Sequence, residues 1–136
     1  MSMSSYRADA TLTTALKGGA TPHLMLHVGN PGYDGTANEA QISLADIARK
    51  ALTFGDAIAN HGTNTERILK NTVLCEWTGA QIDAAQEITH FSIWSASTAG
   101  NVEFIGAVTT PKTTGSDGVS IAVGDLEVAI GVFAKP

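Results

Sequence analysis

The sequence predicts an all-β domain, mainly an antiparallel β-sandwich or jelly-roll-like barrel of about seven strands, with one short N-terminal helix. Three observations support this fold class. Short segments rich in β-branched and aromatic residues recur along the chain, separated by turn residues. Residues 88–96 (ITHFSIWSA) carry apolar side chains on both faces of an extended strand, which is typical of a central strand. In residues 119–123 and 126–133, apolar side chains occur at every second position. The two segments flank Gly124-Asp125, which favours a hairpin with a type II′ turn.

The first predicted element is a helix over residues 8–17, because apolar residues recur there at four-residue spacing. Its apolar stripe consists of Ala8, Leu12 and Leu16. A helix this short is marginal alone, so it must dock either on the domain or on a neighbouring subunit. We therefore divide the chain into a docking segment, residues 1–20, and a single β domain, residues 21–136.

The second element is a strand over residues 23–28, with Leu24, Leu26 and Val28 on its inner face. A polar loop over residues 29–38 follows, because this stretch is dense in turn-forming residues.

Residues 42–54 allow two interpretations. Ser43 and Asp46 form a capping box, which favours a helix. The alternation of side chains from Ile47 to Phe54 instead favours a strand. We favour a strand over residues 48–54, preceded by one helical turn.

The remaining elements are extended. Residues 60–64 form a predicted turn, and residues 68–77 form a strand whose inner face carries Leu69, Val73, Cys75 and Trp77. After a connection over residues 78–86, the central strand forms a hairpin with residues 102–108. Phe91 and Ile93 lie on one face of that strand, and Ile88 and Trp94 lie on the other. Residues 112–118 are predicted to be a polar loop.

Composition excludes several classes of protein. The 136 residues are enough for one domain, and the net charge of −5 argues against nucleic acid or an anionic membrane as a partner. No apolar run approaches the roughly 20 residues of a membrane span, and the first residues do not resemble a signal peptide. A lone cysteine, Cys75, fits folding in a reducing cytoplasm.

Two groups of residues raise the question of a metal site. Four histidines, His23, His27, His61 and His90, lack carboxylates or cysteines at ligand spacing. The loop residues Asn30, Asp34, Asn38 and Glu39 do not match the spacing of an EF-hand. We interpret the loop residues as turn formers and expect no metal.

The sequence also predicts neither an active site nor a cofactor site. Cys75 or a serine could form a nucleophilic site with His90 and an acid, but Cys75 shares the apolar face of its predicted strand, where a thiol stays protonated. No nucleophile elbow or phosphate-binding loop is present in the sequence. Tyr33, Trp77 and Trp94 could stack on sugar rings if exposed, which keeps open a carbohydrate-binding module for host attachment.

Three segments together resemble small structural proteins of tailed bacteriophages, variously labelled decoration, tail-fibre or minor tail proteins. These are residues 26–39 (LHVGNPGYDGTANE), residues 48–55 (ARKALTFG) and residues 88–96, which continue into residues 104–109 (FIGAVT). The resemblance spans roughly residues 10–133. Residues 42–47 depart from the family, which more often has a Gly-Gly-Ser-Tyr turn there.

The resemblance implies a non-enzymatic virion component that assembles in the host cytoplasm. Our first expectation is a capsid decoration (cement) protein, a dimer or trimer that bridges major capsid subunits. A tail-fibre, baseplate or minor tail subunit is the alternative. Contacts with virion proteins are expected in residues 4–17 and 29–39, because mobile segments beside a rigid core often become ordered on binding. The candidate contact residues are Tyr6, Leu12, Leu16, Asn30, Tyr33, Asp34, Asn38 and Glu39.

Overall fold

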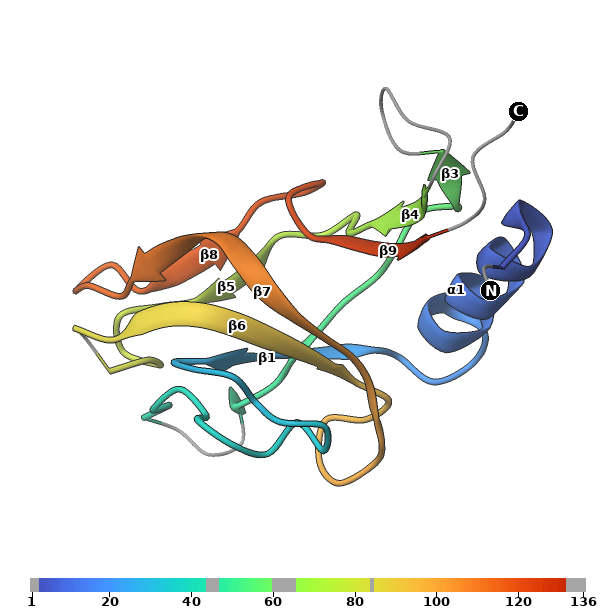
Figure 1. Cartoon of the computed structure of the whole chain (residues 1–136). Coiled ribbons are helices and arrows are strands. Elements are labelled where there is room, and N and C mark those ends of the chain that lie inside the picture. Colours follow the sequence, from blue (N-terminus) through green and yellow to red (C-terminus); the bar gives the residue numbers. More distant parts are fainter. Residues whose placement is uncertain (1–2, 44–46, 60–65, 84, 132–136) are drawn as a thin grey trace.

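The computed structural model describes residues 3–43, 47–59, 66–83 and 85–131. Within these residues the chain forms one helix and nine antiparallel strands, which confirms the predicted all-β class with a single helix (Figure 1). The elements are α1 (Ser5–Lys17), β1 (His23–His27), β2 (Lys50–Ala51), β3 (Ile58–Ala59), β4 (Glu66–Lys70), β5 (Cys75–Trp77), β6 (Glu87–Trp94), β7 (Val102–Thr113), β8 (Val119–Ile121) and β9 (Glu127–Gly131).

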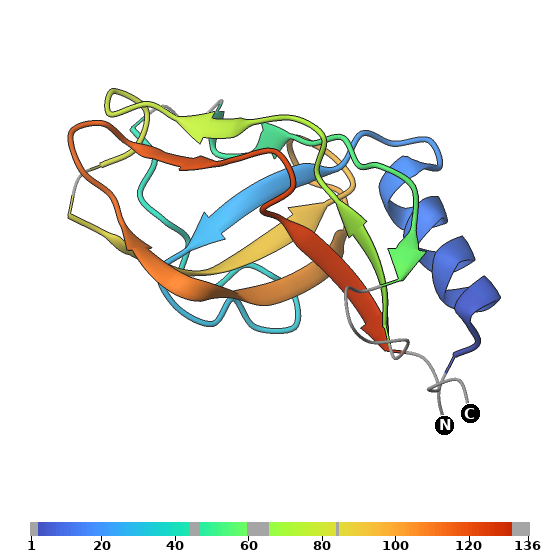
Figure 2. The same ribbon diagram turned by 90° about the horizontal axis from the view of Figure 1, so that it is seen from above.

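The strands form three sheets around one core. The largest sheet has the order β2-β1-β6-β7, a second has the order β3-β4-β9, and β5 pairs with β8. The two smaller sheets lie on the same side of the large sheet (Figures 1 and 2). The core between them takes Leu24 and Ile93 from the large sheet, and Leu69, Trp77 and Val128 from the smaller sheets.

Helix α1 packs against its own domain, which decides between the two docking alternatives. Its stripe residues Leu12 and Leu16 belong to the same core cluster as the strands, and α1 lies beside β4 and β9 (Figure 2). Two contacts between charged side chains fasten it. Arg67 forms a bidentate ion pair with Asp9 at 2.6 and 3.0 Å, and Lys17 pairs with Asp56. The helix begins three residues earlier than predicted, because Ser4 Oγ accepts a hydrogen bond from the Arg7 amide and caps it.

The predicted central hairpin is confirmed. Strand β6 pairs with β7, with Phe91 opposite Gly106 and Ile93 opposite Phe104, and β1 pairs along the other side of β6. One detail of the prediction is wrong: Ile88 lies in the core with Ile93 and does not share the face of Trp94. Pairing is irregular between Ile88 and His90, where β7 contains additional residues, and this irregularity turns Ile88 inward.

The predicted C-terminal hairpin is wrong. Strand β8 pairs with β5, and β9 pairs with β4, so the two segments around Gly124 enter different sheets. The single strand predicted over residues 68–77 is likewise divided into β4 and β5, and Val73 between them is exposed.

Asn71 explains why β8 and β9 enter different sheets and why β4 and β5 do. Its side chain is buried and makes four hydrogen bonds to the backbone. The Nδ2 group donates to the carbonyl oxygens of Val73 (2.8 Å) and Ala122 (3.0 Å), and Oδ1 accepts from the amides of Gly124 and Leu126 (both 3.0 Å). One amide side chain therefore replaces strand pairing at the two places where the chain changes sheets.

Smaller differences follow the same pattern of short strands. Only residues 50–51 of the predicted strand 48–54 are paired as a strand, and Phe54 makes an isolated bridge to Asn71. Val28, predicted inside, is 41% exposed, and residues 112–113 belong to β7 rather than to a loop. Asp46 of the predicted capping box and the turn predicted at 60–64 lie outside the described residues.

Candidate functional site

The loop over residues 29–39 folds back along β1. The Val28 amide donates to the Asn38 carbonyl (2.8 Å), and the Ala40 amide donates to the Leu26 carbonyl (3.0 Å). Gly35 lies so close to the Trp94 side chain that an added Cβ would sit 3.0 Å from its ring, at a φ of +72°. The loop therefore covers the face of the large sheet that points away from the core.

Beneath this loop lies a chain of buried hydrogen bonds. Trp94 Nε1 donates to Ser92 Oγ (2.8 Å), which also bonds His27 Nε2 (2.7 Å), while His27 Nδ1 bonds the Ala37 carbonyl (2.8 Å). Since a carbonyl only accepts, Nδ1 of His27 carries the proton and Nε2 accepts from the serine. Burial lowers the pKa of His27, which keeps it neutral. All three side chains are buried, so this serine–histidine pair fastens the loop to the sheet.

The candidate contact residues of this loop are used mainly in its own turns. Asn30 Oδ1 accepts from the Gly32 amide (2.9 Å), and Asn38 Nδ2 donates to the Asn30 carbonyl (2.8 Å). Asp34 Oδ1 accepts from the Thr36 hydroxyl (2.9 Å) and amide (3.2 Å), and these bonds lower the pKa of Asp34. Their geometry agrees with the interpretation as turn formers.

Two other candidates in the loop face solvent. Tyr33 is fully exposed, and Glu39 is also exposed. Asn30, Asp34 and Asn38 are exposed as well, but Tyr33 presents the large apolar ring of the loop to solvent.

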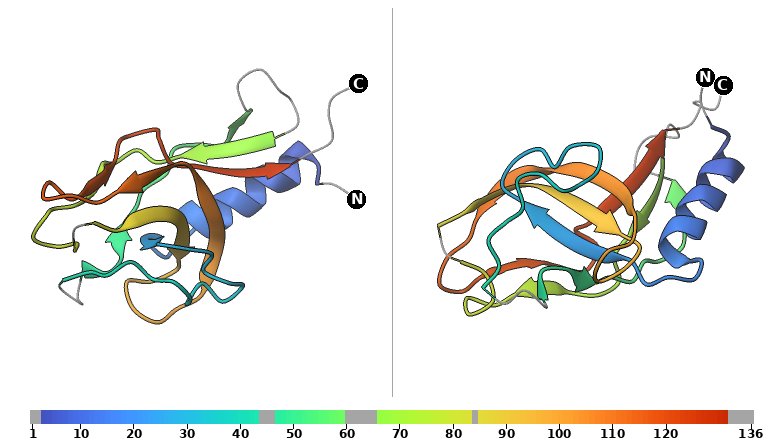
Figure 3. Two further views of the ribbon diagram at one scale, coloured as in Figure 1. Left: turned by 60° about the vertical axis from the view of Figure 1, so that its left-hand side comes forward. Right: turned by 90° about the horizontal axis from the view of Figure 1, so that it is seen from below.

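The candidates in α1 separate into two groups. Tyr6 is 83% exposed, whereas Leu12 and Leu16 are buried in the core of this chain. Leu12 and Leu16 are therefore core residues, and Tyr6 carries the exposed apolar surface of the helix. Figure 3 shows that α1 and the loop lie in different parts of the molecule, so the two candidate segments form separate surfaces.

Each histidine that the structure describes forms its own hydrogen bonds, apart from the other histidines. His23 Nδ1 bonds the Thr21 carbonyl, and His90 Nδ1 bonds the Thr89 hydroxyl, each within two residues along the chain. His27 is bound as described above, and His61 lies outside the described residues. Among the residues that the structure describes, no three metal-ligating side chains gather at one point.

Cys75 and Trp77 are core residues, and Trp94 is buried on the other face of the large sheet, beneath the loop. Burial raises the pKa of the Cys75 thiol to about 11, which opposes thiolate formation. Trp77 is fully buried and donates from Nε1 to the Ile47 carbonyl (3.1 Å). Trp94 is covered by the Arg49 guanidinium, 3.8 Å from the ring centroid. Of the three candidate aromatic residues, Tyr33 is the one whose ring faces solvent.

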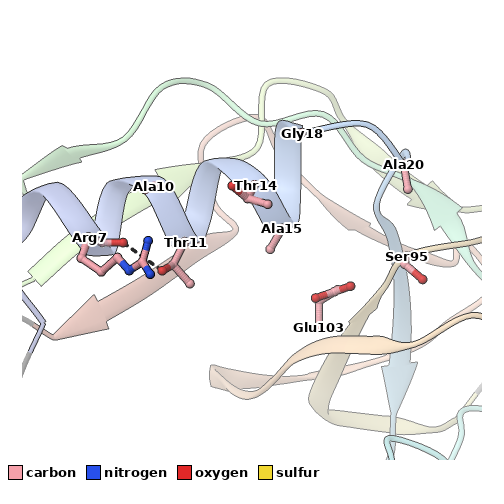
Figure 4. Close-up of a pocket in the computed structure, with 9 residues that line it drawn as sticks. All are labelled: Arg7, Ala10, Thr11, Thr14, Ala15, Gly18, Ala20, Ser95 and Glu103. Carbon is pink, nitrogen blue, oxygen red and sulfur yellow. Dashed lines mark hydrogen bonds between the residues drawn. The ribbon is translucent and has the colours of Figure 1, made fainter.

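A groove of about 490 Å³ separates α1 from the turn end of the β6–β7 hairpin (Figure 4). Its walls carry small side chains between Arg7 on the helix and Glu103 on β7. The other lining residues are Ala10, Thr11, Thr14, Ala15, Gly18, Ala20 and Ser95. Sequence reasoning missed this groove, although the small residues opposite the apolar stripe of the helix are a signal for it.

Comparison with known proteins identifies the family. Residues 2–129 match the model of the family described as "Podophage GP4 fiber I protein gp80". The match covers most of the chain, which therefore belongs to this family of phage fibre proteins. The resemblance to structural proteins of tailed-phage virions is thereby confirmed. The comparison with curated proteins gives no match. In the described part of the chain, no helix is long and apolar enough to cross a membrane.

Proposed function

We propose that this chain, as a member of the podophage fibre I family, is a non-enzymatic structural subunit of a fibre on the phage particle. The observation that carries the proposal is the family match, which includes α1 and every strand up to the middle of β9. Our first expectation from the sequence was a capsid decoration role. The word fibre in the family description instead favours the tail-fibre role, which was the alternative.

The arrangement of polar groups supports a structural role. The buried polar side chains His27, Asn71 and Ser92 all bond the backbone or one another and hold loops to the sheets. Such fixed loops suit a structural subunit, because a preorganised surface lowers the conformational entropy that is lost when a partner binds. Contacts with neighbouring virion proteins would use the exposed tyrosines, Tyr6 and Tyr33, since tyrosine is enriched at interfaces.

Gold-labelled antibodies against this chain, applied to intact particles, test the proposal. Gold on fibres supports it, and gold distributed over the head surface would instead assign the protein to capsid decoration. The matched control is the same antibody preincubated with the purified chain, which must remove the label. Purified particles that lack the chain altogether would contradict both roles.

A further inference from the structure

We propose that the groove between α1 and the turn end of the β6–β7 hairpin binds a short extended segment of a neighbouring virion protein. The segment places an acidic residue at Arg7 and a basic residue at Glu103. This partner deepens the proposed function and rests on it, since a fibre subunit must contact other proteins of the particle. The groove has a volume of about 490 Å³, which suits a short peptide segment. Figure 4 shows Arg7 at one end of the groove and Glu103 towards the other.

Arg7 is the cation of the groove that is free to bind a partner. In the described part of the chain, the side chain of every other lysine and arginine binds a carboxylate or a carbonyl oxygen, whereas the Arg7 guanidinium binds neither. The side chains already bound are those of Lys17, Arg49, Lys50, Arg67, Lys70 and Lys112. A guanidinium presents a planar pair of donors that matches a carboxylate, so an acidic side chain fits this end of the groove.

Glu103 gives the groove a second, opposite charge. It is exposed, and among the described residues it forms no ion pair. Its carboxylate repels an acidic residue at its own end of the groove and attracts a lysine or an arginine there. Ser95, on the same wall, accepts from the Asn101 amide (2.9 Å), which leaves its hydroxyl hydrogen for a carbonyl of the bound segment. The two walls therefore favour a segment with charges of both signs.

The length of the groove favours an extended segment over a small molecule. Its lining residues on α1 run from Arg7 to Gly18, which corresponds to about 16 Å along the helix axis. An extended chain rises about 3.3 Å per residue, so about five residues span this length. The helix wall between the two ends consists of small side chains, including those of Ala10, Thr14 and Ala15. A peptide backbone can therefore approach the helix closely.

Capped five-residue peptides, titrated into the full chain with nitrogen-15 labelling and followed by nuclear magnetic resonance, test the proposal. The four probes carry aspartate and lysine, two aspartates, two lysines or two serines at their ends, with glycine and serine between. The wild type should bind the aspartate–lysine peptide about threefold or more tightly than each of the others, because exposed ion pairs are weak. The shifted amides should lie in residues 7–18 and 95–103.

Glu103→Lys gives a test that a damaged fold cannot imitate. With both ends of the groove basic, this variant should bind the peptide with two aspartates more tightly than the aspartate–lysine peptide. Glu87→Lys is the matched control, because it makes the same change in charge at the start of β6, away from the hairpin turn, and should keep the wild-type order.

Three results overturn the proposal. They are a wild type that binds none of the peptides or all four equally, shifts that lie outside the groove, and a Glu103→Lys variant that keeps the wild-type order. None of these measurements uses phage particles, so the peptide preference and the fibre location can fail separately.

Discussion

Replacing Asn71 should destabilise the protein far more than its small side chain suggests. The side chain makes four hydrogen bonds, two as donor and two as acceptor, all to the backbone of the segments where the chain changes sheets. At about 1 kcal/mol for each bond, Asn71→Ala should lower the free energy of unfolding by about 4 kcal/mol. Asn71→Asp keeps the acceptors but loses both donors and places a carboxylate beside the carbonyls of Val73 and Ala122. We therefore expect a comparable loss from Asn71→Asp.

Urea unfolding provides the assay, because Trp77 and Trp94 are buried and report loss of the core by fluorescence. Asn101→Ala is the matched control: Asn101 is exposed, so its replacement should change the free energy of unfolding by less than about 0.5 kcal/mol. A loss below about 1 kcal/mol for Asn71→Ala, with an unchanged dependence on urea, would refute the role assigned to this side chain.

Three further predictions concern a tight turn, a buried histidine and the packing of α1. Gly118→Ala should cost about 3 kcal/mol or more in unfolding free energy, because φ is +78° and the new Cβ would overlap the Trp77 carbonyl oxygen. Gly115→Ala, whose Cβ meets nothing within 4 Å, should cost about 1 kcal/mol or less. His27 has a lowered pKa when folded, so stability should be highest above pH 6.5 and fall as the pH drops below it. His27→Gln should flatten this fall in urea midpoints more than His23→Gln, and equal slopes would contradict the assignment. Leu12→Ala should cost about 2–5 kcal/mol by thermal or urea unfolding if α1 is part of the core, and a negligible loss would contradict that packing.

Local patterns predicted the elements whose partners are close in sequence. The apolar stripe of residues 8–17 gave the helix, and the polar turn after Trp94 gave the β6–β7 hairpin. In both cases the residues that determine the element lie within about two dozen positions, so periodicity and turn composition are sufficient.

The C-terminal half shows why local patterns fail elsewhere. Residues 119–133 have the alternation and the glycine turn of a hairpin, yet β8 and β9 pair with β5 and β4. The amide of Asn71 binds the backbone on both sides of Gly124, across more than 50 positions. A single asparagine gives no sign in the sequence of so distant a partner, so the local prediction could not include it.

The candidate contact residues in the loop and in α1 were predicted only in part, because local patterns do not include partners that are distant in sequence. Loop residues such as Tyr33 are recognisable from turn composition, and the structure places that side chain in solvent. Leu12 and Leu16 could face either a partner or the domain, and only the position of β4 decides this.

A cryo-electron microscopy map of the phage particle, at a resolution that shows strands, tests the central claim most directly. We expect this chain to fit density in a fibre, with the small sheets and α1 recognisable and Tyr6 or Tyr33 against a neighbouring protein. Density for this chain on the capsid shell, with fibres built from other proteins, would contradict the account.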